Sequence, residues 1–196
     1  ELLSRLRLPF EVIAPDLDET AQPGERPLAL ALRLAKAKAA AVASRDAGAI
    51  VIGCDQVAEL DGRPLGKPGD HAGATAQLRA MRGRKVVFHT AVAVVCEATG
   101  FRACEAALIT VAFRDLSDAD IESYLRAEQP YDCAGSAKVE ALGIALVETI
   151  DSDDPTALIG LPLIRTCALL RRAGLDPLGA RVASFASATD TRGRPR

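Results

Sequence analysis

An apolar run over residues 50–54 leads directly to the polar pair Asp55 and Gln56. The Asp-Gly pair at 61–62 then predicts a tight hairpin turn, after which Lys67 stands between a glycine and a proline. Open α/β sheets carry their crevices at strand ends, so side chains delivered there can face a ligand. A lysine in such a rigid setting suits a point-charge contact with phosphate. The stretch indicates either an ordinary hairpin with a charged rim or one wall of an anion-binding site.

Two adjacent acids, Asp18 and Glu19, stand in a polar loop soon after residues 9–15, which we predict to form a strand. Together with Asp55 they offer hard oxygen atoms of the kind that Mg²⁺ prefers. Magnesium commonly takes one or two protein carboxylates and completes its shell with water and substrate phosphates. The alternative is that these loop acids are solvated or cap a neighbouring turn.

Residues 28–45 predict a helix, because apolar side chains recur there at helical spacing: Leu28, Leu32, Ala35, Ala39 and Val42. Two basic residues, Arg33 and Lys38, lie on this helix. By the period of the α-helix, Lys38 falls about a quarter-turn from the apolar centre and borders the buried face. Its ammonium group either ends in solvent beyond an apolar stem or points into a cleft.

Glu140 lies in a glycine-containing loop that can approach a ligand closely. A carboxylate can accept two hydrogen bonds from the N1–H and N2–H₂ edge of guanine. It also favours a base that carries positive charge, as 7-methylguanine does. The alternative is a surface glutamate beside Lys138.

The order of the predicted elements favours an α/β fold with a mixed, largely extended and twisted sheet flanked by helices. Besides the end of a helix over 1–8, we predict strands over 9–15, 47–60, 85–113 (a long hairpin joined at 99–100) and 144–150, and helices over 28–45, 71–81, 116–125 and 154–174. The helix near 116 opens with a capping box. We expect one domain over 1–181 and a mobile tail over 182–196.

Composition narrows the classes of function. The chain has 196 residues, of which 49% are hydrophobic and 4% aromatic, and its net charge is −2. These values predict a substantial core and give no support for binding to nucleic acid or to a membrane surface. The five scattered cysteines and two histidines form no zinc-binding pattern, and reduced thiols are typical of a cytoplasmic protein. No serine-hydrolase elbow, P-loop or dinucleotide-binding glycine motif occurs.

Taken in order, several stretches resemble the Maf family of nucleotide pyrophosphatases. The matching stretches are ELLSRLRLPFEVIAPDLDET, RLAKAKA, VIGCDQV, LGKP, LSDADIESYL, CAGSAKVEALGI and DPTALIGLPLI, which together cover about residues 1–175. The loop with Glu140 resembles the branch of the family that hydrolyses 7-methyl-GTP. The branch that acts on dTTP and UTP typically has a tyrosine-containing loop with glutamine in place of Glu140.

The resemblance implies a fold like that of Maf and inosine triphosphatase proteins, with a cleft between two lobes, and a homodimer. It implies hydrolysis of a nucleoside triphosphate to the monophosphate and pyrophosphate with a divalent cation, Mg²⁺ or Mn²⁺. Asp55 matches the proposed general base, and Asp55 and Glu19 are the candidate metal ligands. The positions that match substrate-binding residues are Glu19, Lys38, Gln56, Lys67 and Glu140.

Family members begin with a strand and a Ser-x-x-Arg loop that helps to form the phosphate pocket, and this sequence starts just after that loop would end. Two other functions stay open. One is a pyrophosphatase that acts on dTTP, UTP or other non-standard nucleotides. The other is a non-catalytic nucleotide-binding protein that regulates cell division. A purely structural module would leave Asp55 and Lys67 unexplained.

Overall fold

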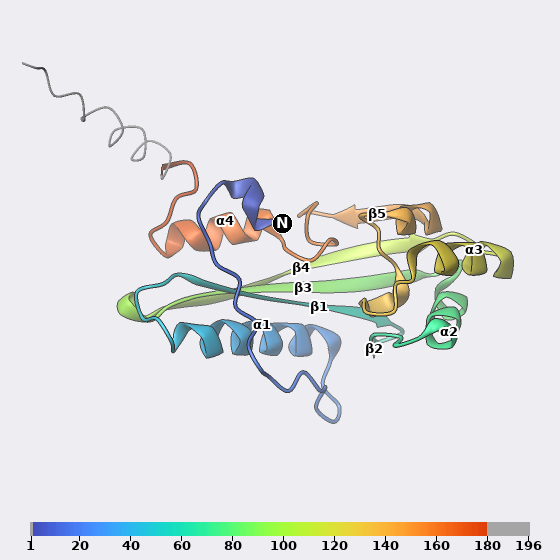
Figure 1. The fold of residues 1–196 in the computed structure, drawn as a ribbon, viewed down its shortest axis with the longest axis horizontal. Coiled ribbons are helices and arrows are strands. Elements are labelled where there is room, and N and C mark those ends of the chain that lie inside the picture. The colour runs from blue at the N-terminus through green and yellow to red at the C-terminus, as the bar shows by residue number, and fades with distance from the viewer. Residues whose placement is uncertain (1, 180–196) are drawn as a thin grey trace, which may run out of the picture.

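The computed structural model describes residues 2–179, and the tail predicted over 182–196 lies outside this range. Five strands form one sheet in the order β2-β1-β3-β4-β5, and helices lie on both of its faces (Figure 1). The strands are β1 (Val51–Leu60), β2 (Arg63–Leu65), β3 (Lys85–Cys96), β4 (Phe101–Phe113) and β5 (Val147–Ser152). The α-helices are α1 (Pro27–Ala43), α2 (His71–Met81), α3 (Asp118–Glu128) and α4 (Leu163–Arg172). Short 3₁₀ turns occur at Leu3–Leu6, Glu97–Thr99, Ala134–Ser136 and Leu142–Leu146.

The predicted α/β class, with an extended sheet and flanking helices, is confirmed. Every neighbouring pair of strands within residues 2–179 is antiparallel, so the parallel pair that a mixed sheet requires does not occur in this part of the chain. The predicted hairpin turn is present between β1 and β2. Asp61 and Gly62 have φ values of 52° and 76°, which is the left-handed geometry that a tight hairpin turn requires.

Strand β3 is buried along most of its length because helices cover both faces of the sheet there. Ala91, Ala93 and Val95 belong to the cluster that α1 covers on one face. Val92 and Val94 pack with α4 on the other face. Two covered faces explain why this part of the sequence is a continuous apolar run, with no alternation of apolar and polar residues.

Helix α1 approaches β1 closely at Gly53. A Cβ atom on this residue would lie 2.4 Å from the carbonyl oxygen of Ala35 and 2.5 Å from the backbone nitrogen of Ala39. Real Cβ atoms essentially never approach other atoms this closely, so only glycine allows the helix to sit here. The close approach brings the middle of α1 against the strand that carries Asp55.

The buried face of α1 differs in part from the predicted one. The buried residues are Pro27, Leu30, Ala31, Leu34, Ala35, Ala39 and Ala43. Of the predicted apolar set, Leu28, Leu32 and Val42 are only partly buried. Small alanine side chains occupy the positions nearest to the sheet, and this allows the short distance between helix and strand.

The other end of the sheet packs against α2 and α3 (Figure 1). Phe88 of β3, Leu78 of α2 and Leu125 of α3 belong to its hydrophobic core. The predicted capping box opens α3, since Ser117 accepts a hydrogen bond from the backbone of Asp120 and the Asp120 carboxylate accepts one from the backbone of Ser117. The long strands β3 and β4 therefore connect two separately packed halves.

The strand predicted over residues 9–15 does not form, and this segment has no regular structure. It runs across the front of the sheet and of α1 in Figure 1, and Val12 is 85% exposed. Prolines at 9 and 15 remove backbone donors at the two ends of the segment. No strand within residues 2–179 pairs with it, so it gains no ladder of hydrogen bonds.

The last helix begins at Leu163, although the sequence predicts that it begins at residue 154. Residues 155–160 form turns, and Gly160 has a φ of 109°, which an α-helix does not allow. Pro162 then directly precedes the helix. Among residues 2–179, no helix is both long enough and apolar enough to cross a membrane.

We expect Gly53→Ala to destabilise the protein by about 1–3 kcal/mol, because the added methyl group would push the backbone of α1 away from β1. Urea unfolding followed by circular dichroism measures this change. Gly48→Ala is the matched control, since its Cβ would meet only the Asp46 carboxylate at 3.5 Å. Equal stability of the two variants would contradict the close helix–strand contact.

Candidate active site

Three charged side chains from distant parts of the chain meet beside β1. The Lys38 ammonium on α1 lies 2.8 Å from Asp55 Oδ1 and 2.7 Å from Glu19 Oε1. The side chain of Asp55 is only 10% exposed, whereas that of Glu19 is 48% exposed. We call Glu19, Lys38 and Asp55 the carboxylate–lysine cluster. It carries one more negative than positive charge when all three groups are ionised.

Burial governs the proton affinity of the cluster. It raises the pKa of the Asp55 carboxyl group above its ordinary value, and the positive charges of Lys38 and Lys67 partly offset this rise. Burial also disfavours the charged form of Lys38, but hydrogen bonds to Asp55 and Glu19 outweigh it, so the pKa of Lys38 is raised. Asp55 is therefore a stronger base than an exposed aspartate and is held beside a permanent cation.

The loop that carries Glu19 is held onto α1 by Arg33. The guanidinium of Arg33 binds both carboxylate oxygens of Glu25, with distances of 2.7 Å and 2.9 Å, and donates to the carbonyl oxygen of Thr20 at 3.0 Å. Asp18 accepts a hydrogen bond from the backbone of Thr20 and stabilises the turn locally. Of the two adjacent acids, Glu19 thus joins the cluster and Asp18 caps a turn.

Lys67 lies in an exposed turn after β2 and forms no ion pair with another residue of the range 2–179. Its charge lowers the pKa of Asp55, which places it near the carboxylate–lysine cluster. The turn is fixed on both sides of the lysine. Gln77 donates to the carbonyl oxygen of Gly66 at 2.9 Å, and the backbone of Gly69 donates to the carbonyl oxygen of Tyr131 at 3.0 Å.

Gln56 points to the face of the sheet opposite to Asp55, because neighbouring side chains alternate along a strand. Its amide nitrogen donates to the carbonyl oxygens of Ala157 and Leu158 at 2.9 Å and 3.1 Å, and it lies 2.8 Å from Thr90 Oγ1. Gln56 therefore holds the segment 154–161 on the sheet. Its oxygen accepts no hydrogen bond from another described residue and stays available to a ligand.

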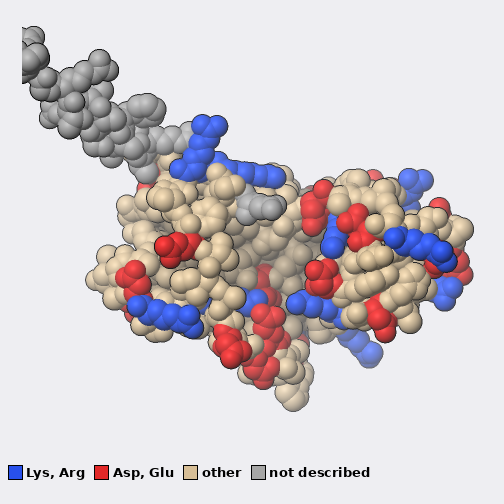
Figure 2. All heavy atoms as spheres, viewed as in Figure 1, with Lys and Arg blue, Asp and Glu red and all other residues tan. Residues whose placement is uncertain are grey.

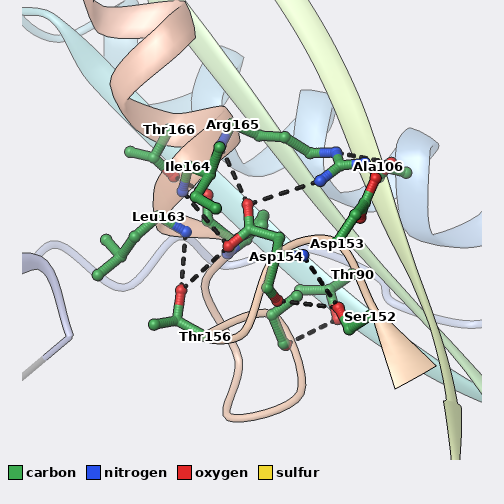
Figure 3. A network of polar contacts seen from close by, with 12 residues as sticks. Thr90, Ala106, Ser152, Asp153, Asp154, Thr156, Leu163, Ile164, Arg165 and Thr166 are labelled. Carbon is green, nitrogen blue, oxygen red and sulfur yellow. Dashed lines mark hydrogen bonds and ion pairs between the residues drawn. The ribbon is translucent and has the colours of Figure 1, made fainter. Parts of the chain in front are cut away.

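Segment 154–161 is also held by a buried network that Figure 3 shows. The Asp154 carboxylate is fully buried and accepts hydrogen bonds from the backbone of Ile164 (3.3 Å) and Arg165 (3.0 Å). It therefore caps the N-terminus of α4 from outside the helix. Thr156 adds a second cap, since its hydroxyl accepts from the backbone of Leu163 at 2.9 Å.

Cys54 adds a contact on the same face of β1 as Gln56. Its thiol lies 3.0 Å from the carbonyl oxygen of Gly160, to which it donates. Burial raises the pKa of this thiol to about 12. Cys54 is thus a neutral hydrogen-bond donor in the wall of the site.

Glu140 is exposed and lines a cavity of about 760 Å³ together with Ile52, Cys54, Ile159 and Gly160. The N-terminal segment forms the opposite wall of this cavity. Figure 2 shows that the face seen there is hollowed between its two halves and that charged side chains gather around the hollow.

The loop around Glu140 is fixed on both sides of the glutamate. The backbone of Lys138 donates to the Tyr124 hydroxyl at 2.9 Å, and the backbone of Gly143 donates to the carbonyl oxygen of Lys138, also at 2.9 Å. The Lys138 ammonium pairs with Asp132 at 3.4 Å, so it does not neutralise Glu140.

The residues present fit a divalent cation that is held partly by the substrate. Glu19 Oε2 and Asp55 Oδ2 accept no hydrogen bond from another residue of the described chain, so two hard oxygen atoms remain. No group of three or more acidic, histidine or cysteine side chains within residues 2–179 could hold a metal alone. One or two carboxylates plus phosphates is the usual arrangement for Mg²⁺.

The structure thus brings Glu19, Lys38 and Asp55 into contact, with Lys67 within electrostatic reach, and places Glu140 and Gln56 toward the opposite face of the sheet. Sequence reasoning missed the role of Asp154 in fixing the wall of the site. An aspartate–proline pair before an apolar stretch predicts a helix start. Here the aspartate instead caps a helix that begins nine residues later.

Comparison with known proteins agrees with these features. The family model described as "Maf-like protein" matches residues 1–173. A protein named "7-methyl-GTP pyrophosphatase" from Albidiferax ferrireducens is 64% identical over 180 residues, which cover 92% of this chain and 90% of the relative. Relatives with the same name from Polaromonas sp. (66% identical, covering 89% and 80%) and Cupriavidus metallidurans (58% identical, covering 92% and 90%) are similar. The chain therefore belongs to the Maf family.

Proposed function

We propose that this protein hydrolyses 7-methyl-GTP to the nucleoside monophosphate and pyrophosphate. The observation that carries the proposal is the carboxylate–lysine cluster, in which a buried aspartate is held by a lysine beside a second carboxylate. The relatives named "7-methyl-GTP pyrophosphatase", with identities of 64% and 66%, support the choice of substrate.

In the proposed reaction, Asp55 accepts a proton from a water molecule that attacks the α-phosphorus. A bond forms between the water oxygen and phosphorus as the bond to the bridging oxygen breaks, and pyrophosphate leaves. The raised pKa of Asp55 brings its proton affinity closer to that needed at neutral pH, which favours general-base catalysis. Lys38 orients the carboxylate, and Lys67 is free to bind phosphate oxygens of the leaving group.

We propose that Glu19 and Asp55 hold a divalent cation, Mg²⁺ or Mn²⁺, together with phosphate oxygens of the substrate. Such a cation neutralises the triphosphate and lowers the pKa of bound water. The chain itself supplies the two free carboxylate oxygens. The Lys38 ammonium contacts both carboxylates and reduces the repulsion between their negative charges.

For base recognition, we propose that Glu140 accepts hydrogen bonds from the N1–H and N2–H₂ edge of 7-methylguanine. The positive charge of the methylated base adds attraction to a carboxylate that has no cationic partner among the described residues. The free oxygen of Gln56 lies on the same face of the sheet and provides a further acceptor.

We also propose a cytoplasmic homodimer, and light scattering would test the oligomeric state.

We expect Asp55→Asn to lower kcat for 7-methyl-GTP by about 10²–10⁴-fold, the usual contribution of a general base. The measurement is pyrophosphate release with Mg²⁺ across 7-methyl-GTP, GTP, dTTP, UTP and CTP. Asp151→Asn is the matched control, because Asp151 is exposed on β5 and has no ion pair with a described residue. Preferred turnover of dTTP or UTP would contradict the substrate, and nucleotide binding without turnover would favour a regulator.

Glu140→Gln should reduce the preference for 7-methyl-GTP over GTP by about tenfold, because glutamine keeps an acceptor for the guanine edge but lacks the negative charge that attracts the positively charged methylated base. The ratio of kcat/KM values for the two nucleotides measures this preference. Glu148→Gln, on the exposed edge of β5, is the control. An unchanged ratio in Glu140→Gln would mean that Glu140 does not contact the base.

The acid limb of the pH profile should reflect Asp55. Activity requires the ionised carboxylate, so kcat/KM falls as pH drops through the raised pKa of Asp55. Lys38→Gln removes a positive charge that lowers this pKa, and the acid limb should therefore move to higher pH. Lys36→Gln, an exposed lysine on the same helix, should leave the limb in place. A shift to lower pH in Lys38→Gln would exclude Asp55 as the titrating base.

A further inference from the structure

The side chain of Gln77 on α2 joins the two ends of the proposed site. Its amide nitrogen donates to the carbonyl oxygen of Gly66 at 2.9 Å, in the turn that carries Lys67. Its amide oxygen accepts a hydrogen bond from the hydroxyl of Ser136 at 2.6 Å, in the loop that leads to Glu140. One side chain thus bridges the proposed phosphate-binding turn and the proposed base-binding loop.

The loop end of this bridge is a strained position. Ser136 is fully buried and has a φ of 53°, a left-handed conformation that is rare for residues other than glycine. The preceding Gly135 also has positive φ, and a Cβ atom added there would lie 3.4 Å from the side chain of Ala58 and 3.5 Å from that of Phe88. Such conformations persist only where the surroundings hold them, and the hydrogen bond from the Ser136 hydroxyl to Gln77 is one of the contacts that hold it.

The turn end has little other support from side chains. Lys67 and Gly66 are exposed, and the turn has no regular secondary structure. Besides the bond to Gln77, the backbone of Gly69 donates to the carbonyl oxygen of Tyr131, which belongs to the chain leading into the same base-binding loop. The turn and the loop are therefore connected to each other twice, once through Gln77 and once directly.

We propose that Gln77 is a positioning residue that sets the location of Lys67 relative to Glu140, and so matches the site to the distance between the phosphates and the base of one nucleotide. The proposal rests on the function proposed above. Gln77 acts through Gly66 and Ser136 and does not itself touch the substrate.

Two readouts separate the two ends of the site. The inhibition constant of pyrophosphate reports on the turn with Lys67, and the ratio of kcat/KM for 7-methyl-GTP over GTP reports on the loop with Glu140. Gln77→Ala should weaken pyrophosphate inhibition and lower the ratio, each by about threefold or more, because residues in one network couple. Ser136→Ala breaks only the loop end, so it should lower the ratio and leave pyrophosphate inhibition within about twofold.

Hydrogen exchange followed by mass spectrometry gives a test that does not depend on turnover. In Gln77→Ala, peptides that cover 65–70 and 133–143 should both exchange faster, while peptides from β3 keep the wild-type rate. Gln22→Ala is the matched control, since Gln22 lies in an exposed loop and its side chain bonds to no described residue.

A change in only one of the two peptides, or in neither, would overturn the proposal. So would faster exchange throughout β3, because it would mean that the whole fold is destabilised. If the wild-type protein hydrolyses no nucleotide, the proposed function fails, and the exchange experiment still decides whether Gln77 fixes both segments.

Discussion

The close contact between α1 and β1 at Gly53 is the constraint on which the site depends. Because no Cβ separates the strand from the backbone of Ala35 and Ala39, the helix lies near enough for Lys38 to reach Asp55 at 2.8 Å. The same ammonium then binds Glu19 from a loop that has no regular structure of its own. A bulkier interface would leave a carboxylate buried without its cation, which is strongly unfavourable.

Two consecutive residues of β1, Asp55 and Gln56, point to opposite faces of the sheet and contact different parts of the chain. Asp55 faces α1 and the carboxylate–lysine cluster, while Gln56 faces the segment 154–161 and the side of the sheet where Glu140 lies. The period of two along a strand is what makes this division possible. Under the proposed function, chemistry at the phosphates and selection of the base therefore take place on opposite faces of one strand.

Much of this could be predicted from sequence because it depends on local signals. The Asp-Gly turn after β1, the capping box of α3 and the border position of Lys38 on α1 each follow from nearby residues. The partners of Gln56 and Asp154 could not be predicted in this way. Gln56 binds backbone carbonyl groups about a hundred positions away, and any residue type can provide such an acceptor. The apolar residues of segment 9–15 predict a strand, but a strand also needs a neighbour to pair with, and the segment has none within residues 2–179.

The partly buried thiol of Cys54 affects how the protein reacts with oxidants. Only the thiolate form of cysteine reacts readily with peroxides and alkylating agents. Burial raises the pKa of the Cys54 thiol to about 12, so the thiol stays protonated at neutral pH. The wall of the cavity therefore carries a sulfur atom that donates a hydrogen bond and, as a protonated thiol, reacts slowly with oxidants and alkylating agents.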